Sequence, residues 1–318
     1  MTNEHNVLVL HQVPHQGSPS DVASAISDRI ESIEIETAND YNDALDRISR
    51  ADIVVSRRLD STLLESAEKL RWVQALSAGV GSYDLDQLQR EDIVLTNASG
   101  VHSVPIAEQV LGYMLTFERN LHEGIRRQNA REWRHYRAGE LRGKTVGIIG
   151  LGEIGQEIAR VTDALGMTAI GTKRTPEELS HVREVYGPDE TLTVVGKADY
   201  VVIACPLTAE TEGLIDGRAL DSMKPDAVLV NVGRGKVVDE DALLYALRKG
   251  QIGGAALDVQ AEEPLPTDSP LWNLSNVIIT PHMAGATPHY WDRCAEIFAE
   301  NYDRFTADKW EEMRNRIV

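Results

Sequence analysis

Cysteine is scarce in this chain of 318 residues, which carries only Cys205 and Cys294. Two cysteines do not make the disulfide framework of a small secreted protein, so a fold held by covalent bridges is excluded. Long apolar runs are also lacking, and no segment approaches the length that crosses a membrane. The first six residues, Met1 to Asn6, have neither the basic start nor the apolar stretch of a secretory signal. We therefore expect a reduced, cytoplasmic protein with no membrane contact.

Lysine is the second scarce residue, and basic residues as a whole are outnumbered. Only eight lysines occur, so 24 of the 32 basic residues are arginines, and 50 acidic residues bring the formal net charge to −18. A chain this acidic is a poor partner for nucleic acid. An acidic surface with few lysines is typical of halophilic proteins, in which high ionic strength screens self-repulsion. An ordinary acidic cytosolic protein is the alternative, because net charge reflects solubility rather than fold.

Short apolar runs typical of strands recur along the chain and alternate with segments compatible with helices. This alternation predicts βαβ units and parallel sheets, and the length allows two domains. We therefore expect an α/β fold of two Rossmann-like or flavodoxin-like parallel-sheet domains. The first series of predicted strands lies at 7–10, 33–35, 53–56, 72–76 and 93–96. A second series of six lies at 146–149, 168–171, 200–204, 228–232, 255–259 and 277–280.

Between the two series, an amphipathic stretch from 106 to 125 predicts one long connecting helix. Its apolar face would carry Val110, Leu111, Met114, Leu115 and Leu121. The following segment, 126–141, mixes charges with Trp133 and Tyr136. Apolar surface in so polar a segment often contacts a partner subunit, so we expect a homodimer. The last segment, 290–318, is helical in pattern and is expected to pack on the first domain.

A glycine-rich turn stands directly after the predicted strand that ends at Ile149. Gly150, Gly152 and Gly155 form the pattern G-x-G-x-x-G, and apolar residues at helical spacing follow it. In such a turn the first glycine permits the tight bend, the second lets backbone approach a pyrophosphate, and the third lets helix pack on strand. The helix that begins near Glu153 and Ile154 would offer free N–H groups to the anion. The pattern alone is weak, but its strand–turn–helix context predicts a dinucleotide site.

The end of the next predicted strand indicates which dinucleotide to expect. An acidic side chain there normally binds the ribose hydroxyls and selects NAD, but this chain has Thr172, Lys173 and Arg174. Two cations fit a 2′-phosphate, so we expect NADP(H) to be preferred, with NAD(H) possible. The segment 175–178 matches an N-cap, a first-turn proline and a capping-box glutamate, so a helix is expected to begin there. The alternative is an exposed basic turn without a ligand.

Three further strand ends carry charged residues. Arg234 lies within the segment 231–235, Glu263 within 257–264, and His282 within Thr280-Pro-His282. Open α/β folds bind ligands at the carboxyl edge of the sheet, so we expect these side chains to converge there. Taken singly, a histidine after proline is often a turn residue, and an arginine between glycines often caps a helix. No other pair of histidines has ligand-like spacing with a carboxylate, so we predict no metal.

With these motifs the chain resembles the D-isomer specific 2-hydroxyacid dehydrogenase family over nearly its whole length. The matching segments are 76–81, 96–100, 107–108, the glycine turn, 206–215, the arginine loop, 258–264 and 280–282. The resemblance implies a substrate-binding domain from residues 1–100 and 290–318. It also implies a central dinucleotide-binding domain, residues 101–289, that closes over an interdomain cleft. Gln109 departs from the family, where histidine often follows Ala-Glu, and we expect this change to affect packing only.

The residues themselves suit the reduction of a 2-oxo acid, which needs a carboxylate anchor, a polarised carbonyl and a proton donor. The planar guanidinium of Arg234 can bond a carboxylate and the neighbouring carbonyl oxygen at once. His282 would donate the proton as hydride arrives and remove it in the reverse direction. Glu263 beside the imidazolium would favour its charged form and keep a proton available near neutrality.

Further site residues are implied by the resemblance alone. The backbone N–H groups of Ala78, Gly79 and Val80 would bind the substrate carboxylate. Asp258 would bond the nicotinamide carboxamide, and Ser103 and Thr211 would meet the phosphates or the ribose. The other implied cofactor contacts are Cys205, Pro206, Val232, Gly233, His282 and Gly285.

These observations predict an NADPH-preferring 2-oxoacid reductase that forms the D-hydroxy acid. Formate oxidation is disfavoured, because relatives with that activity carry glutamine at the position of Glu263, while phosphoglycerate oxidation stays possible. The alternative from another class is a dinucleotide-sensing corepressor, which would bind NADPH yet turn over no 2-oxo acid. Such a protein would usually carry an extra tail, for which we expect no room in 318 residues. The residues that select the substrate's side chain would lie on loops of the first domain, and the sequence does not identify them.

Overall fold

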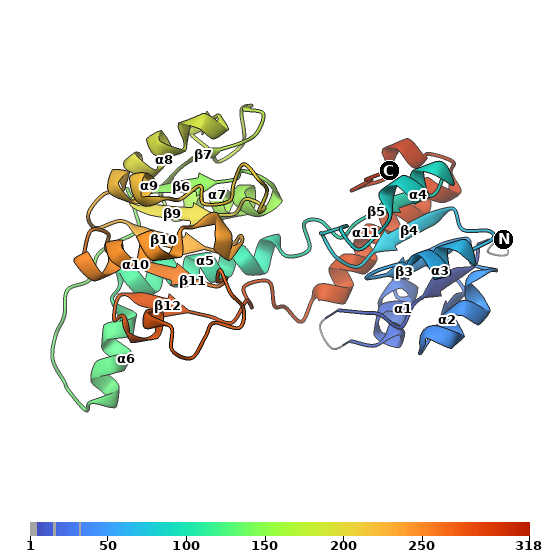
Figure 1. The fold of residues 1–318 in the computed structure, drawn as a ribbon, viewed down its shortest axis with the longest axis horizontal. Coiled ribbons are helices and arrows are strands. Elements are labelled where there is room, and N and C mark those ends of the chain that lie inside the picture. Colours follow the sequence, from blue (N-terminus) through green and yellow to red (C-terminus); the bar gives the residue numbers. More distant parts are fainter. Residues whose placement is uncertain (1–4, 15–16, 32) are drawn as a thin grey trace. The chain divides into compact units, whose positions relative to one another are not determined.

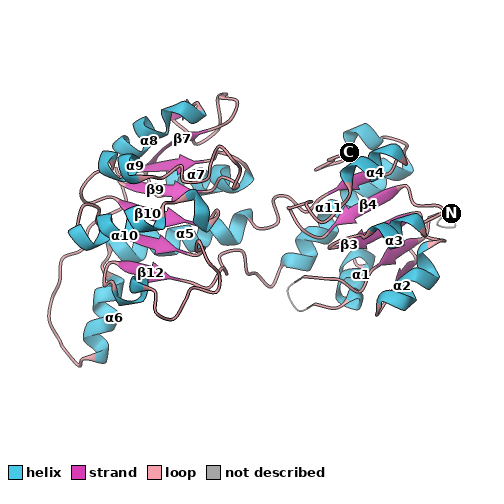
Figure 2. Ribbon diagram, in the orientation of Figure 1, coloured by secondary structure: helices cyan, strands magenta, loops and turns pink. Residues whose placement is uncertain are grey.

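The computed structural model describes residues 5–14, 17–31 and 33–318, and the chain divides into two compact units. Unit 1 is Met1–Val101 with Thr287–Val318, and unit 2 is His102–Ala286. Each unit is a parallel sheet with helices on both faces (Figure 1, Figure 2). The predicted α/β fold with two parallel-sheet domains is therefore confirmed. The expectation about a secretory signal concerns mainly residues 1–4, which lie outside the described residues.

Unit 1 is built on five parallel strands. The strands are β1 Val7–Val9, β2 Ile35–Thr37, β3 Ile53–Ser56, β4 Trp72–Ala75 and β5 Val94–Thr96, in the spatial order β2-β1-β3-β4-β5. The helices are α1 Pro19–Ser27, α2 Tyr41–Ile48, α3 Ser61–Glu65, α4 Leu85–Arg90 and α11 Tyr290–Thr306, with a 3-10 turn at Trp310–Glu312. Helices α1 to α4 begin after Ser18, Asp40, Asp60 and Asp84, whose side chains accept a hydrogen bond from an N–H of the first turn.

Two hydrophobic layers enclose the sheet of unit 1. One layer joins the sheet to α1 and α11, and the other joins it to α2, α3 and α4. Trp72 of β4 is fully buried and stacks on Phe298 of α11, with ring centroids 4.9 Å apart. Helix α11 thus ties the end of the chain to the first series of strands. An aromatic pair of this kind contributes about 0.5–1.5 kcal/mol beyond its area burial.

Unit 2 is built on seven parallel strands in the order β12-β11-β10-β9-β6-β7-β8. The strands are β6 Thr145–Ile149, β7 Thr168–Thr172, β8 Glu184–Tyr186, β9 Tyr200–Ile203, β10 Val228–Asn231, β11 Gly254–Leu257 and β12 Val277–Ile279. The helices are α5 Ser103–Glu118, α6 Leu121–Asn129, α7 Glu153–Ala164, α8 Thr191–Lys197, α9 Gly217–Ser222 and α10 Glu240–Lys249. Short 3-10 turns lie at Pro188–Glu190, Gly235–Val237 and Pro270–Asn273.

The central strands of unit 2 are buried on both faces, as continuous apolar runs require. Every residue of β9, β10 and β11 is buried. Helices α5 and α7 cover one face, and α8, α9 and α10 cover the other. This arrangement leaves the carboxyl ends of the strands as the edge where loops from six different strands meet.

Two sequence predictions about unit 2 are wrong near the basic pair. The sheet has a seventh strand, β8, which pairs with β7 so that Ile170 lies opposite Glu184. No helix begins at Thr175, and residues 175–183 contain no helix. The capping pattern is a local signal, whereas this segment is held by Leu179 and Val182, which pack against the core on the α7 side. The edge strand is short and half-buried, so it lacks the apolar run that marks the others.

The predicted connecting helix at 106–125 is also wrong, because it is two helices. Helix α5 ends at Glu118, and Asn120 has a left-handed backbone with φ of 49° before α6 begins. Asparagine adopts this conformation more readily than most residues. Its side-chain Nδ2 donates to the carbonyl oxygen of Arg137 at 2.7 Å. Leu121, expected on the apolar face, is therefore 45% exposed.

Within the described part of the chain, no helix is both long and apolar enough to cross a membrane. Strand β2 covers 35–37 rather than 33–35, and most other predicted strands differ from the structure by one or two residues at an end.

Candidate functional site

The predicted site residues of unit 2 follow six neighbouring parallel strands. The glycine turn follows β6, Lys173 follows β7, Cys205 follows β9, Arg234 follows β10, and Asp258 and His282 follow β11 and β12. All these strands run in the same direction, so these residues lie along one edge of the sheet. The structure therefore brings the predicted cofactor and catalytic segments of unit 2 together at one edge.

The glycine turn has the geometry of a phosphate cradle. Gly150 has φ of 103°, and a Cβ there would lie 2.8 Å from the backbone of Cys205. A Cβ on Gly155 would approach the carbonyl oxygen of Gly150 to 2.2 Å, so only glycine lets α7 pack on β6. A Cβ on Gly152 would meet nothing within 4 Å, and Gly152 is the N-cap of α7 without a side-chain cap. Gly150 and Gly155 are thus packed against backbone, whereas the space beside Gly152 is open, and a pyrophosphate would fit there.

The basic pair after β7 is anchored at one residue and exposed at the other. Thr172 is buried, and its hydroxyl accepts a hydrogen bond from the Gly150 N–H at 3.3 Å. Lys173 Nζ lies 3.4 Å from the carbonyl oxygen of Leu151 and 3.1 Å from a carboxylate oxygen of Glu177. Arg174 is exposed. The two cations therefore stand directly beside the glycine turn, where the adenosine ribose of a dinucleotide would lie.

His282 and Glu263 form a hydrogen-bonded acid–base pair. Nδ1 of His282 lies 2.7 Å from Oε2 of Glu263, and both side chains remain partly exposed. The backbone of His282 is left-handed, with φ of 50°, a conformation that is uncommon for a non-glycine residue. Its N–H donates to the carbonyl oxygen of Asp258 at 2.8 Å, which helps to hold this conformation. Such held conformations concentrate at functional sites.

The carboxylate of Glu263 is kept charged by its surroundings. Partial burial acts to raise its pKa, but hydrogen bonds from His282 and from the backbone N–H of Gln260, with the nearby charge of Arg234, outweigh burial and lower it. The Gln260 N–H donates to Oε1 at 3.0 Å, so the two carboxylate oxygens have different partners. Because Nδ1 of His282 is occupied by Glu263, Nε2 is the ring atom left to exchange a proton.

The loop that carries Arg234 is fixed by its backbone. Asn231 is buried, its Nδ2 donates to the Arg234 carbonyl oxygen at 3.1 Å, and its Oδ1 accepts from the Gly233 N–H at 3.1 Å. A Cβ on Gly235 would come within 1.9 Å of the Gln260 backbone, so this loop packs tightly on the segment that leads to Glu263. The Arg234 side chain is exposed, and its Nη1 donates to the Gly233 carbonyl oxygen at 2.7 Å.

A buried hydrogen-bond network below His282 was not predicted from the sequence. The Thr280 hydroxyl donates to Oδ1 of Asp258 at 2.5 Å and also meets the hydroxyl of Tyr113, from α5. The same carboxylate accepts the N–H groups of Met283 at 3.0 Å and Ala284 at 2.9 Å. Asp258, predicted as a nicotinamide contact, thus also shapes the turn that presents His282. Thr280 lies in the matched segment 280–282, which is the one signal that could have identified it.

Other predicted cofactor contacts have roles within their own loops. The Thr211 hydroxyl donates to the Pro206 carbonyl oxygen at 2.7 Å and accepts from the Thr208 N–H at 2.8 Å. Cys205 is buried, and burial raises the pKa of its thiol to about 11. The Ser103 hydroxyl is buried without a hydrogen-bond partner in the described part of the chain.

Three further predicted contacts, Val232, Gly233 and Gly285, lie close to other groups of unit 2. Val232 is buried, and a Cβ on Gly233 would lie 2.8 Å from the Cys205 carbonyl oxygen. The Gly285 carbonyl oxygen lies 3.1 Å from Nδ1 of His102. Among residues 5–14, 17–31 and 33–318, no group of three or more His, Cys, Asp or Glu could hold a metal ion.

In unit 1, the turn Ser77–Val80 follows β4 and has the character of an anion site. All four carbonyl oxygens of the turn accept hydrogen bonds. Those of Ser77 and Val80 accept from the backbone N–H groups of Ala98 and Tyr83. Those of Ala78 and Gly79 accept from the side chains of Asn97 and Ser77. The N–H groups of Ala78, Gly79 and Val80 have no hydrogen-bond partner among the described residues. A Cβ on Gly79 would meet nothing within 4 Å. These N–H groups are therefore free for a ligand, as a backbone anion site requires.

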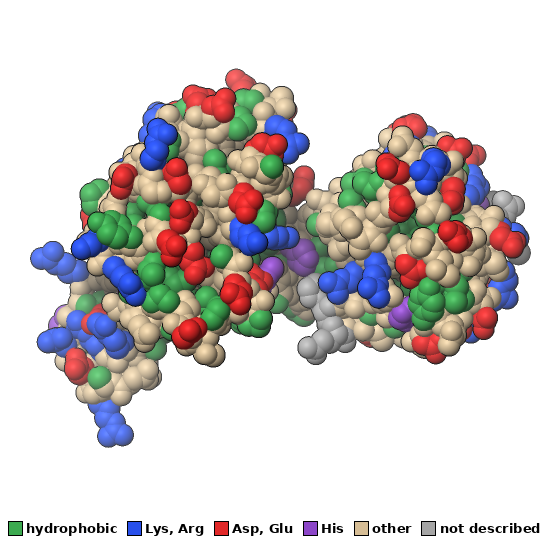
Figure 3. Space-filling model, in the orientation of Figure 1, with side chains coloured by type: hydrophobic (Ala, Val, Ile, Leu, Met, Phe, Trp, Pro, Cys, Tyr) green, Lys and Arg blue, Asp and Glu red, His purple; other side chains and the backbone are tan. Residues whose placement is uncertain are grey.

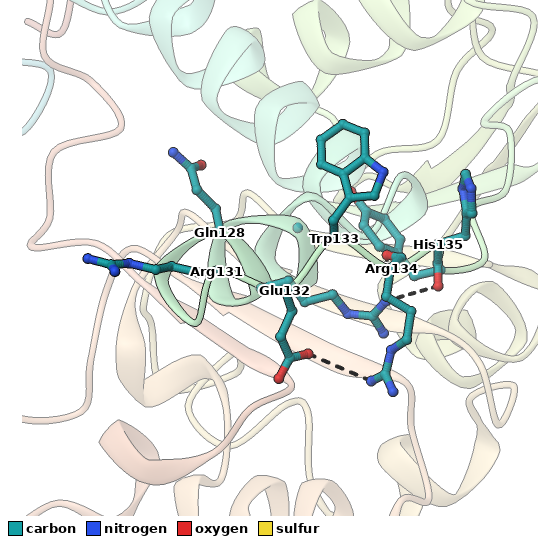
Figure 4. Close-up of a pocket in the computed structure, with 9 residues that line it drawn as sticks. Gln128, Arg131, Glu132, Trp133, Arg134 and His135 are labelled. Atoms are coloured by element: carbon teal, nitrogen blue, oxygen red, sulfur yellow. Dashed lines mark hydrogen bonds and ion pairs between the residues drawn. The ribbon is translucent and has the colours of Figure 1, made fainter.

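A separate cavity of about 690 Å³ lies at α6 and the loop after it. Figure 4 shows Gln128 and Arg131 on one side, and Trp133, Arg134 and His135 on the returning loop. Residues 126–137 hold five arginines and one acidic residue, and blue side chains gather around α6 in Figure 3. Trp133 is fully exposed, and Ile125 is 59% exposed. We call residues 121–139 the α6 arm.

Comparisons with known proteins identify the family to which the chain belongs. Residues 111–284 match the family model described as "D-isomer specific 2-hydroxyacid dehydrogenase, NAD binding domain". A glyoxylate reductase of Pyrococcus furiosus is 35% identical over 275 residues, which are 82% of this chain and 81% of that protein. A D-3-phosphoglycerate dehydrogenase of Methanocaldococcus jannaschii is 34% identical over 87% of this chain, but the match spans only 54% of that longer relative.

Solved structures show the same architecture. A D-isomer specific 2-hydroxyacid dehydrogenase family protein from Aeromonas salmonicida superposes with a TM-score of 0.81 at 33% identity, covering 99% of each chain. Another, from Xanthobacter autotrophicus Py2 in complex with NADPH and MES, has a TM-score of 0.81 at 28% identity over 99% of this chain and 98% of the other. The glycine cradle, the histidine–glutamate pair and these matches lead to one conclusion. The chain belongs to the D-isomer specific 2-hydroxyacid dehydrogenase family of nicotinamide-dependent enzymes.

Proposed function

We propose that this enzyme reduces small 2-oxo acids to D-2-hydroxy acids and prefers NADPH to NADH. The observation that carries the proposal is the 2.7 Å contact between Nδ1 of His282 and Glu263, at the same sheet edge as the glycine turn. A histidine whose Nδ1 is held by a carboxylate can donate its Nε2 proton and remain charged until it does so. The D configuration of the product is carried over from the family.

Each step of the proposed reaction can be assigned to residues of this chain. Gly150, Gly152 and Gly155, with the N-terminus of α7, would hold the dinucleotide, and the bound nicotinamide would supply the hydride. Arg234 would bind the substrate carboxylate and polarise the carbonyl next to it. His282 would give its Nε2 proton to the carbonyl oxygen as that oxygen gains negative charge, and Glu263 would stabilise the imidazolium until then.

The reaction is tested with glyoxylate, pyruvate and longer aliphatic and aromatic 2-oxo acids, assayed with NADPH. Replacing His282 by Gln should lower kcat by about 10²- to 10⁴-fold, because the proton donor is lost. The Kd for NADPH, measured by fluorescence, should change little. His289→Gln, a replacement of another exposed histidine, serves as the control. Normal NADPH binding by the unaltered enzyme with no turnover of any 2-oxo acid would instead favour the corepressor alternative.

The NADPH preference rests on Lys173 and Arg174, which stand beside the glycine turn without an acidic residue in the position that selects NAD. The solved relative from Xanthobacter autotrophicus binds NADPH. Lys173→Asp should raise KM for NADPH about 10-fold or more, since a charge-assisted contact to the 2′-phosphate is lost, and should not raise KM for NADH, which has no 2′-phosphate. Lys249→Asp, on α10, is the control. A lower KM for NADH than for NADPH in the unaltered enzyme would refute the preference.

We further propose that the enzyme is a homodimer and that the α6 arm contacts the partner subunit. The support is the apolar surface of Trp133 and Ile125 on an otherwise polar segment. The five arginines of residues 126–137 would face a partner whose chain is strongly acidic.

We also propose that the enzyme is cytoplasmic, because both cysteines are free and buried.

A further inference from the structure

A second cavity of about 720 Å³ lies in unit 1, at the carboxyl edge of three neighbouring strands. Strand β3 pairs with β1 on one side and with β4 on the other. Gln12 follows β1, Arg57 and Arg58 follow β3, and Ser77 follows β4, and all four line the cavity. Gly79 and Gly81 of the turn at 77–81 line it as well, so the turn that carries the free N–H groups borders the same cavity.

The charge of this cavity is unusual for the chain. It is lined by two arginines and by no acidic residue, although acidic residues outnumber basic ones 50 to 32 in the sequence. Neither Arg57 nor Arg58 has a carboxylate partner in the described part of unit 1, whereas Arg47 and Arg50 both pair with Glu36. Two adjacent cations without a carboxylate partner give this cavity a local positive charge that attracts an anion from solution.

The arginine pair is held in place by its backbone. The Arg57 N–H donates to the Gln12 carbonyl oxygen at 3.1 Å, and the Ser82 hydroxyl donates to the Arg57 carbonyl oxygen at 3.1 Å. The Ser56 hydroxyl donates to the Arg58 carbonyl oxygen at 2.8 Å. Nε of Arg58 contacts the side-chain oxygen of Gln12. The loop is therefore fixed while both side chains are exposed at the cavity.

We infer that this cavity selects 2-oxo acids that carry a second anionic group at the end remote from the 2-oxo carboxylate. The inference rests on the proposed function, the reduction of 2-oxo acids. It takes the N–H groups of Ala78, Gly79 and Val80, which the family resemblance implies as substrate contacts, to bind the first carboxylate together with Arg234. The guanidinium groups of Arg57 and Arg58 then bind the second anion, for which their planar, bidentate geometry is suited. The second anion is a carboxylate, a phosphate or a sulfonate, since all three present oxygens in that geometry.

The test compares two substrates of equal length that differ at one end. 2-Oxopentanoate ends in a methyl group, and 2-oxoglutarate ends in a carboxylate. In the full-length enzyme with saturating NADPH, kcat/KM should be about 10-fold or more higher for 2-oxoglutarate, as one charge-assisted contact gives. Phosphohydroxypyruvate and sulfopyruvate form the other arms, and the best of the three dianions identifies the anion. Raising the salt concentration should reduce the preference.

Substitutions of the two arginines test whether the preference for dianionic substrates arises in this cavity. Arg57→Gln and Arg58→Gln should lower kcat/KM for the preferred dianion at least 5-fold more than for 2-oxopentanoate, and Arg57→Lys should restore part of it because the charge is kept. Arg50→Gln, an exposed arginine of the same unit that pairs with Glu36, is the control. Equal losses for both substrates, or a preference for 2-oxopentanoate in the unaltered enzyme, would overturn the inference while leaving 2-oxo acid reduction intact. No turnover of any 2-oxo acid would refute the proposed function instead.

Discussion

Glu263 is the single residue whose chemistry can be tested most directly by pH. Its pKa is lowered, so it is a carboxylate at neutral and mildly acidic pH, where it stabilises protonated His282. In the proposed reaction the imidazole gives a proton to the substrate, so the rate of reduction should fall at high pH. In Glu263→Gln the negative charge that favours the protonated ring is lost, and the descending limb of kcat/KM for reduction should move to lower pH.

The measurement is the pH profile of kcat/KM for one 2-oxo acid with NADPH, between about pH 5 and 9. Glu262→Gln is the matched control, because it removes a neighbouring exposed carboxylate that makes no hydrogen bond to His282. A profile unchanged in Glu263→Gln would remove this carboxylate from the proton-transfer step.

Residues at strand ends could be predicted from the sequence, whereas the residues that hold them could not. Arg234, Glu263 and His282 follow apolar runs whose strand character is local, so their common edge was predictable. The contact of Tyr113 with Thr280 joins residues 167 positions apart, and no local pattern reports it. Arg57 and Arg58 follow a predicted strand, but their lack of acidic partners is visible only when the neighbouring loops are in place.

Among the secondary-structure elements, the α6 arm differs most from the rest of its unit. Helix α6 has no buried residue, and the loop after it is tied back by Arg127, whose Nη1 donates to the carbonyl oxygens of Arg134 at 2.8 Å and His135 at 2.9 Å. The arm is thus ordered by its own polar contacts, and its exposed Trp133 and Ile125 are free to contact a partner.

If the arm is the dimer contact, Trp133→Ser with Ile125→Ser should convert the enzyme to a monomer at micromolar concentration. The apolar surface lost from each subunit is the part that supplies binding energy, since large aromatic residues dominate such contacts. Sedimentation velocity measures the change, with Tyr245→Ser, which removes another exposed aromatic ring of unit 2, as the control. A dimer that persists in the double variant would place the contact elsewhere.

The two secondary-structure predictions that were wrong, at β8 and before α6, failed for the same physical reason. Strand β8 is short and only partly buried, and it exists because its backbone pairs with β7. The break before α6 depends on one asparagine in a left-handed conformation and on its bond to Arg137. In both cases a contact distant in sequence decides between structures that local propensity leaves nearly equal in free energy.

Over the whole molecule, the net charge of −18 is distributed on the surface of both units, as the many red side chains on the face in Figure 3 show. Like charges at this density repel, and unfolding separates them, so repulsion lowers the free energy of unfolding. Nearest-neighbour ion pairs such as Arg47 with Asp43 and Glu36 offset part of this, but the 50 acidic residues exceed the 32 basic ones and leave 18 negative charges unbalanced.

Screening should therefore stabilise the folded enzyme. At 1 M salt the Debye length is about 3 Å, against about 30 Å at 0.01 M, so repulsion between surface carboxylates is almost removed. We expect Tm at pH 7 to rise by several degrees from low to molar KCl. The same comparison near pH 4.9, the calculated isoelectric point, separates screening from other salt effects, because little net charge remains to be screened there. An equal rise at both pH values, or none at pH 7, would show that self-repulsion does not limit the stability of this chain and would remove the physical basis for a halophilic origin.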